Sequence, residues 1–189
     1  MNKILIKTSF NERDKLGRPD WNLHFMAMTY VIANRSFDTS TKCGCIATKD
    51  NVILSTGFNG PPGGSLDDMV PINKRPDKYY FMEHSERNAI YNAAKIGISL
   101  DGCTFYVTGV PCIDCMRGML RLHPKEIIYL CVNDTVMNHY KTDVGCADTW
   151  LQIVAPKTQV IEYQTYKAKG QIRDYLRTIL YNTAEKLGI

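Results

Sequence analysis

The sequence contains no apolar run that approaches the roughly 20 residues needed for a membrane-spanning helix, so an integral helical membrane protein is not expected. It also has no low-complexity tract and no internal repeat, which argues against fibrous, solenoid and largely disordered classes. The first ten residues carry lysines but no apolar segment of signal-peptide length followed by a cleavage site. We therefore expect a soluble, cytoplasmic protein that does not bind a membrane.

A strong excess of either charge is also missing. Twenty-three Lys and Arg residues against 19 Asp and Glu residues give a net charge of +4. This mild excess suits a small anionic ligand and falls short of the basic surface typical of stable nucleic-acid binding. With 189 residues, of which 44% are hydrophobic, the chain fits one domain over residues 1–189. A chain of this size can bury a core without needing a metal or disulfides merely to fold.

A disulfide framework is not expected either, because the seven cysteines are odd in number and the chain lacks an export signal. Metal binding or thiol chemistry is then the question. Cys112 and Cys115 stand three residues apart, directly after Pro111. The other five cysteines are interpreted as buried small side chains or spare thiols: Cys43, Cys45, Cys103, Cys131 and Cys146.

Hydrophobic periodicity predicts helices that alternate with strands. The expected helices cover residues 20–36, 85–95, 112–122, 148–155 and 172–187, and the expected strands residues 43–48, 52–56, 104–108, 126–132 and 160–163. Residues 57–76 form a loop, rich in glycine and proline, that is too long for a mere connection. The alternation predicts an α/β layered fold with helices on both faces of a sheet.

The most informative constellation is His84-Ser85-Glu86, followed after 24 residues by Pro111-Cys112-Ile113-Asp114-Cys115. Both halves begin predicted helices. Two cysteines three positions apart share one helix face, and the positive end of the helix dipole lowers the pKa of a thiol placed there. A histidine at the start of the other helix completes a nitrogen and two-sulfur set that suits tetrahedral zinc.

Three protein ligands leave one zinc position open, which is typical of catalytic zinc because a water can occupy it. Glu86 stands two residues after His84, about 200° further round a helix, so it should not compete as a ligand on the same face. We interpret Glu86 as a proton carrier for that water.

This pattern, H-x-E…P-C-x-x-C, is the signature of zinc deaminases of nucleobases. Over residues 20–135 the sequence resembles deoxycytidylate (dCMP) deaminases, within the cytidine deaminase superfamily. Residues 84–90 resemble their H-A-E-x-N-A-I motif, residues 105–112 their Y-V-T…P-C run, and residues 57–64 their G-Y-N-G-x-P-x-G loop. Ser85 and Phe58 replace the usual Ala and Tyr. Residues 136–189 diverge.

The resemblance implies a three-layer cytidine deaminase-like fold with a mixed sheet of about five strands, and an enzyme that hydrolyses dCMP to dUMP and ammonia. It implies these site residues: zinc ligands His84, Cys112 and Cys115, catalytic Glu86, substrate-binding Asn59 and Tyr106, and effector-binding Gly60, Pro62 and Gly64. The implied effectors are dCTP as activator and dTTP as inhibitor, with Mg²⁺ accompanying the triphosphate. Homo-oligomers from dimer to hexamer are also implied.

Several alternatives stay open at this point. The substrate could be dCTP, a nucleoside, a tRNA adenosine or a riboflavin precursor, or the chain could be a non-catalytic nucleotide-binding zinc module. Some relatives hold a second, structural zinc, which Cys43 and Cys45 could build here with one of His24, His123 and His139. The aromatic cluster at residues 79–81 is expected to pack under the long loop rather than to stack on a base; the alternative is that it borders the pocket, because it precedes His84 closely.

Overall fold

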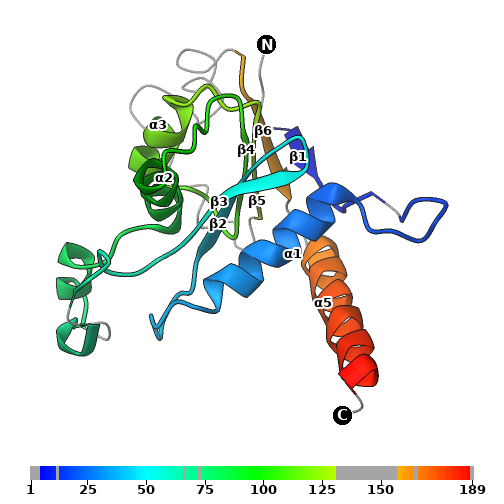
Figure 1. The fold of residues 1–189 in the computed structure, drawn as a ribbon, viewed down its shortest axis with the longest axis horizontal. Helices are drawn as coiled ribbons and strands as arrows, with labels where there is room; N and C mark the ends of the chain where they lie inside the picture. Colours follow the sequence, from blue (N-terminus) through cyan, green and yellow to red (C-terminus); the bar gives the residue numbers. More distant parts are fainter. Residues whose placement is uncertain are drawn as a thin grey trace.

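In the computed structural model, residues 5–11, 13–65, 67–71, 74–130, 157–163 and 166–187 are described. Their strands form one sheet in the order β1-β6-β5-β4-β2-β3 (Figure 1). The strands are β1 (Leu5–Lys7), β2 (Gly44–Lys49), β3 (Val52–Phe58), β4 (Thr104–Val107), β5 (Glu126–Leu130) and β6 (Gln159–Tyr163). The sheet thus has six strands where about five were expected, because Leu5–Lys7 adds an edge strand parallel to β6.

The sheet is mixed. The strands β4, β5, β6 and β1 pair in parallel, whereas β2 is antiparallel to both of its neighbours, β3 and β4. The predicted hairpin between β2 and β3 is confirmed. Its turn residues Asp50 and Asn51 have φ angles of 50° and 62°, the positive values that a tight hairpin turn demands and that Asp and Asn tolerate best after glycine.

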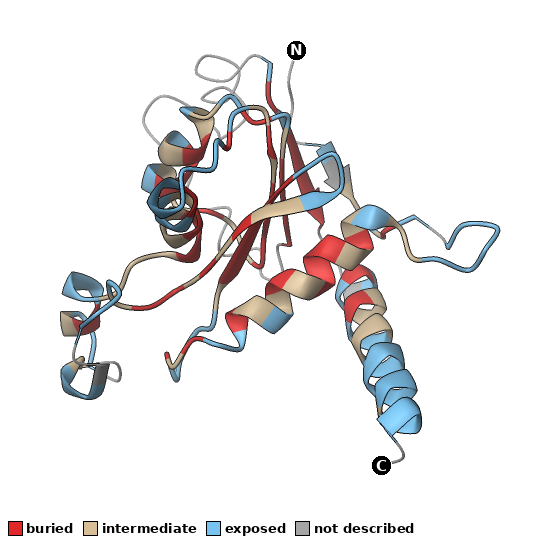
Figure 2. Cartoon of the chain, in the orientation of Figure 1, coloured by how far each residue is buried: buried red, intermediate tan, exposed pale blue. Residues whose placement is uncertain are grey.

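Helices cover both faces of the sheet, which confirms the predicted α/β class. The helices of the described residues are α1 (Trp21–Ala33), α2 (Ser85–Lys95), α3 (Ile113–Leu120) and α5 (Tyr166–Leu187), with 3₁₀ turns η1 (Asp67–Met69) and η2 (Asp77–Tyr80). One core packs α2 and α3 against the sheet, and the other packs α1 and α5 against its opposite face. Figure 2 shows the buried residues on the strands and on the helix sides that face them. None of these helices is long and apolar enough to span a membrane.

The helix starts follow from local sequence. The Asp20 carboxylate accepts hydrogen bonds from the backbone N–H groups of Asn22 and Leu23, so Asp20 is the predicted N-cap of α1. The helix α2 ends before Gly97, whose φ of +72° is the left-handed conformation that stops helices. The helix predicted at residues 148–155 and the end of the strand predicted at 126–132 lie outside the described residues.

The long loop leads into an arm, the segment that carries η1 (Asp67–Met69) and η2 (Asp77–Tyr80). In Figure 1, η1 and η2 lie well away from the sheet. The prediction that residues 79–81 pack under the loop is wrong: Tyr79, Tyr80 and Phe81 keep 56%, 85% and 49% of their surface exposed. They are exposed because η2 projects from the body of the domain. The C-terminal half of α5 projects as well and is largely exposed (Figure 2).

Candidate metal centre and catalytic cavity

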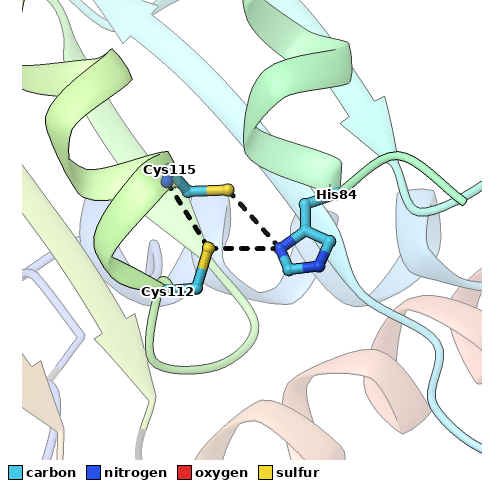
Figure 3. A group of neighbouring side chains, drawn as sticks. All are labelled: His84, Cys112 and Cys115. Atoms are coloured by element: carbon cyan, nitrogen blue, oxygen red, sulfur yellow. Dashed lines mark hydrogen bonds between the residues drawn. The ribbon is translucent and has the colours of Figure 1, made fainter. Parts of the chain in front are cut away.

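The N-termini of α2 and α3 bring the three predicted metal ligands together. His84 is the N-cap residue of α2 and Cys112 is the N-cap residue of α3, one turn before Cys115. The helix α3 follows β4 and therefore begins at the carboxyl end of that strand. Figure 3 shows the three side chains pointing toward one another from the two helix starts.

The spacing of the ligand atoms fits zinc. His84 Nδ1 lies 3.5 Å from Cys112 Sγ and 3.5 Å from Cys115 Sγ. Tetrahedral bonds of about 2.05 Å to nitrogen and 2.3 Å to sulfur would put such atoms about 3.6 Å apart. All three ligand atoms lie within 4.8 Å of one another. The donor set and its spacing therefore suit a zinc ion with one position left for a non-protein ligand.

The electrostatics of the two thiols also favour a cation. A hydrogen bond from Cys115, aided by His84, lowers the pKa of Cys112 to about 3 despite partial burial. The same pairing with Cys112, together with burial, raises the pKa of Cys115. Without a cation, the two sulfurs together therefore carry a single negative charge. A divalent cation would let both thiols ionise, because it offsets the repulsion between two adjacent thiolates.

No second cluster of metal-binding side chains forms among the described residues. His24 Nδ1 instead lies 2.8 Å from the Tyr175 hydroxyl, and His123 Nδ1 lies 3.1 Å from Asp101. Burial raises the pKa of Cys43 to about 11, so this thiol is protonated at neutral pH. His139, Cys131 and Cys146 lie outside the described residues.

Glu86 lies in the first turn of α2 and lines the same cavity as His84 and Cys112. It is 5% exposed and accepts a hydrogen bond of 2.9 Å from the Ser85 hydroxyl. Burial raises the pKa of this carboxyl above its usual value. A buried carboxyl with a raised pKa beside the candidate metal centre binds a proton more readily than an exposed one, which suits a group that takes up and releases protons.

The cavity in front of these residues has a volume of about 520 Å³, which suits a ligand of nucleotide size. One wall consists of the starts of α2 and α3, and another is formed by the segment around η2. This second wall holds functional candidates that sequence reasoning missed, namely Arg75, Lys78 and Asp38, which is the ion-pair partner of Lys78. No periodic or spacing signal marks these residues, because they meet only when the arm folds back beside the loop that precedes β2.

Asn59 lines the cavity, as its predicted substrate role requires. Its side-chain amide also ties two loops together. The oxygen accepts a 2.8 Å hydrogen bond from the Cys43 N–H, and the nitrogen donates a 2.8 Å bond to the Thr41 carbonyl. Asn59 therefore helps to shape the cavity wall independently of any contact that it makes with a substrate.

Tyr106, which was predicted to bind the substrate, does not line this cavity. Its ring packs 5.3 Å from the ring of Phe25 on the α1 face of the sheet, and its hydroxyl donates a 2.8 Å hydrogen bond to Asn22. Side chains alternate along a strand, so the neighbouring Val107 faces the cavity instead.

The predicted effector residues also lie outside the lining of this cavity. Gly60 forms a backbone bridge with Glu83, with hydrogen bonds of 3.1 and 2.8 Å. Pro62 and Gly64 are exposed, and Gly64 has a φ of +90°. Because the His84 N–H donates a 2.9 Å hydrogen bond to the Glu83 carboxylate, Glu83 connects this loop to a metal ligand.

Residues 19–131 match the family described as the cytidine and deoxycytidylate deaminase zinc-binding region. This chain belongs to that family. The matched range contains the three candidate metal ligands, Glu86 and Asn59, so the family assignment and the geometry concern the same part of the molecule.

Named relatives agree with the family. The chain is 37% identical over 117 residues to the deoxycytidylate deaminase of Mus musculus, and 36% identical over 117 residues to that of Homo sapiens. Each match covers 59% of this chain and 65% of the relative, so the chain spans slightly less than two thirds of those proteins. Among solved structures, the dCMP deaminase of cyanophage S-TIM5 in complex with dCMP and dUMP matches with a TM-score of 0.54 and 25% identity. That match covers 74% of this chain and 93% of the phage chain.

Proposed function

We propose that this chain is a zinc-dependent dCMP deaminase, a cytoplasmic single-domain enzyme that hydrolyses dCMP to dUMP and ammonia. The observation that carries the proposal is the combination in one cavity of His84, Cys112 and Cys115, at zinc-ligand spacing, with the buried carboxyl of Glu86. The choice of dCMP is supported by the names of the mouse and human relatives and by the nucleotides bound to the phage enzyme.

Zinc at this site would supply a hydroxide nucleophile, since coordination lowers the pKa of water to about 7. His84, Cys112 and Cys115 would hold the ion and keep one position open toward the cavity. Glu86 would accept a proton from the attacking water and deliver it to ring nitrogen N3 while the bond from oxygen to C4 forms.

Glu86 would then carry the second proton to the exocyclic amine while the bond between C4 and nitrogen breaks. Ammonia leaves and the uracil ring remains, so dCMP and water give dUMP and ammonia without any oxidant or reductant. The burial of Glu86 suits this role, because a raised pKa lets one carboxyl act first as base and then as acid. General acid–base help of this kind contributes about 10²- to 10⁴-fold to the rate.

We further propose that dCTP activates and dTTP inhibits the enzyme through Gly60, Pro62 and Gly64, with Mg²⁺ accompanying the triphosphate, in a homo-oligomer of two to six chains. The exposed, positive-φ backbone at Gly64 supports a phosphate-binding loop, because a residue without Cβ lets N–H groups approach an anion closely. The bridge from Gly60 to Glu83 gives the loop a physical route to the metal centre.

The test is ammonia release by purified, zinc-loaded protein from dCMP, dCTP, deoxycytidine and cytidine, each with and without added dCTP or dTTP. We expect dCMP to have the highest kcat/KM and the triphosphates to shift its rate in opposite directions. If the folded, zinc-loaded protein releases ammonia from none of these compounds, the proposal is wrong. A tRNA adenosine or riboflavin-precursor substrate, or a non-catalytic zinc module, would then replace it.

A further inference from the structure

The charged side chains that line the cavity are largely matched in pairs. Lys78 is buried, with 4% of its side chain exposed, and its Nζ lies 2.8 Å from Asp38 Oδ2 and 2.7 Å from Ser40 Oγ. The other Asp38 oxygen accepts hydrogen bonds from Ser40 and from the Thr41 N–H. Lys78 and Asp38 therefore neutralise each other inside the wall.

The second carboxylate of the wall, Glu83, is matched as well. It forms an ion pair with Arg87, one turn along α2, and accepts the hydrogen bond from the His84 N–H. Glu86 is reserved for proton transfer in the proposed reaction. The cavity lining therefore holds no spare carboxylate for a further cation among the described residues.

Arg75 is the cationic side chain of the cavity lining that belongs to neither of these ion pairs. It is exposed, and no carboxylate of the described residues forms a salt bridge with it. Its guanidinium instead donates a 3.3 Å hydrogen bond to Ser40 Oγ and lies 5.8 Å from the centre of the Tyr79 ring. The side chain thus stands at the cavity wall with most of its donor groups available.

The positive charges beside Ser40 are not fully balanced by negative charges. The Ser40 hydroxyl oxygen lies within hydrogen-bond distance of both Arg75 and Lys78, so two positive charges converge on one small group. Asp38 offsets only one of them. A bound anion would offset the other, and the planar fork of a guanidinium matches two oxygens of a phosphate.

We propose that Arg75 binds the 5′-phosphate of the substrate and thereby makes the enzyme select a nucleoside monophosphate over the free nucleoside. This inference rests on the proposed function of the same cavity. The assignment divides the cavity chemically: the starts of α2 and α3 act on the base, and the wall around η2 holds the phosphate.

The test compares the wild type with Arg75→Ala, Arg75→Lys and a control, Arg177→Ala, which removes an exposed arginine from α5. The kcat/KM values for dCMP and for deoxycytidine are measured on zinc-loaded protein. We expect Arg75→Ala to lower the value for dCMP about 10- to 100-fold, mainly through KM, because a charge-assisted hydrogen bond is lost. The value for deoxycytidine should stay within about twofold, Arg75→Lys should recover part of the loss, and the control should match the wild type.

Binding gives a second readout that does not depend on turnover. Calorimetric titration with dUMP and with deoxyuridine should show the same loss of affinity for dUMP in Arg75→Ala and no change for deoxyuridine. Activation by dCTP, measured with deoxycytidine as substrate, should survive in this variant, since Arg75 is assigned to the substrate phosphate rather than to the effector.

Three results would overturn the inference. Equal losses for dCMP and deoxycytidine would mean that Arg75 only shapes the arm. Unchanged kinetics with dCMP would place the phosphate elsewhere, and loss of dCTP activation alone would assign Arg75 to the effector. If the wild type deaminates neither compound, the proposed function fails. The role of Arg75 in phosphate binding is then tested by dUMP affinity alone, and equal affinity in the wild type and in Arg75→Ala refutes it.

Discussion

Replacing Gly57 by alanine should displace the start of α2 and with it the candidate metal centre. Gly57 lies near the end of β3, where the strand packs against α2. A Cβ at this position would lie 2.3 Å from the Ala89 backbone nitrogen and 2.3 Å from the Ser85 backbone oxygen, whereas ordinary contacts begin at 3.4 Å. Both neighbours are backbone atoms that cannot rotate away. The strand and the helix would therefore have to separate by about 1 Å.

The expected cost follows from this displacement. Overpacking of this kind costs about 1–3 kcal/mol, so we expect the free energy of unfolding to fall by about 2 kcal/mol in urea denaturation. Ser85 stands between His84 and Glu86, so both groups would move with the start of α2. A misplacement of about 1 Å can cost about 10²-fold in rate, and we expect a loss of that order in kcat/KM for dCMP.

Gly63→Ala is the matched control. No atom lies within 4 Å of a Cβ at Gly63, and its φ is not positive, so the same chemical change meets open space. Its free energy of unfolding should stay within about 0.5 kcal/mol of the wild type. If Gly57→Ala unfolds at the same urea concentration as Gly63→Ala, close backbone approach does not hold α2 on β3, and the reasoning is refuted.

Other predictions concern the buried ion pair and the metal. Lys78→Met should lower the free energy of unfolding by about 3–5 kcal/mol, because it leaves the Asp38 carboxylate buried without its cation. The double variant Asp38→Asn/Lys78→Met should recover part of that loss in urea denaturation, and simply additive losses would argue against the pairing. Burial disfavours the ionised Asp38, but hydrogen bonds from Lys78, Ser40 and Thr41 outweigh it and lower the pKa of Asp38 to about 2. Because this pKa lies below the unfolded value of about 3.9, Asp38 adds about 2 kcal/mol of stability above that value, and this is lost as pH falls toward 2. Asp38→Asn should flatten the curve of stability against pH in that window, and an unchanged curve would contradict the assignment. Chelation of zinc should lower the melting temperature, and Cys112→Ser should reduce the zinc content measured by atomic absorption; full occupancy in Cys112→Ser would exclude Cys112 as a ligand.

The parts of the fold that the sequence predicts well are those set by local interactions. The N-cap at Asp20 and the tight turn at Asp50 and Asn51 depend on residues within a few positions of one another. The grouping of His84, Cys112 and Cys115 was also predictable, because each stands at the start of a helix and the family signature fixes their spacing. The side chains that the helix starts contribute to the site can therefore be predicted from the sequence.

The parts that failed depend on contacts between distant segments. The motif did not indicate that Tyr106 lies outside the cavity lining, because strand register decides which face of β4 meets the cavity. Lys78 and Asp38 are 40 residues apart and pair only through the path of the arm, which no periodicity encodes. The exposure of residues 79–81 has the same origin. Arg75 becomes a candidate only after the structure shows which charges are already paired.

The most direct test of the central claim compares zinc-loaded wild type with Glu86→Gln, counting zinc and dCMP turnover in the same samples. Glutamine keeps the size of the side chain but cannot carry the proton. We expect about one zinc per chain in both proteins and ammonia release from dCMP only in the wild type, with a loss of at least about 10²-fold in the variant. Equal turnover by the variant, at full zinc occupancy, would contradict the assignment of Glu86 as the proton carrier of a zinc deaminase.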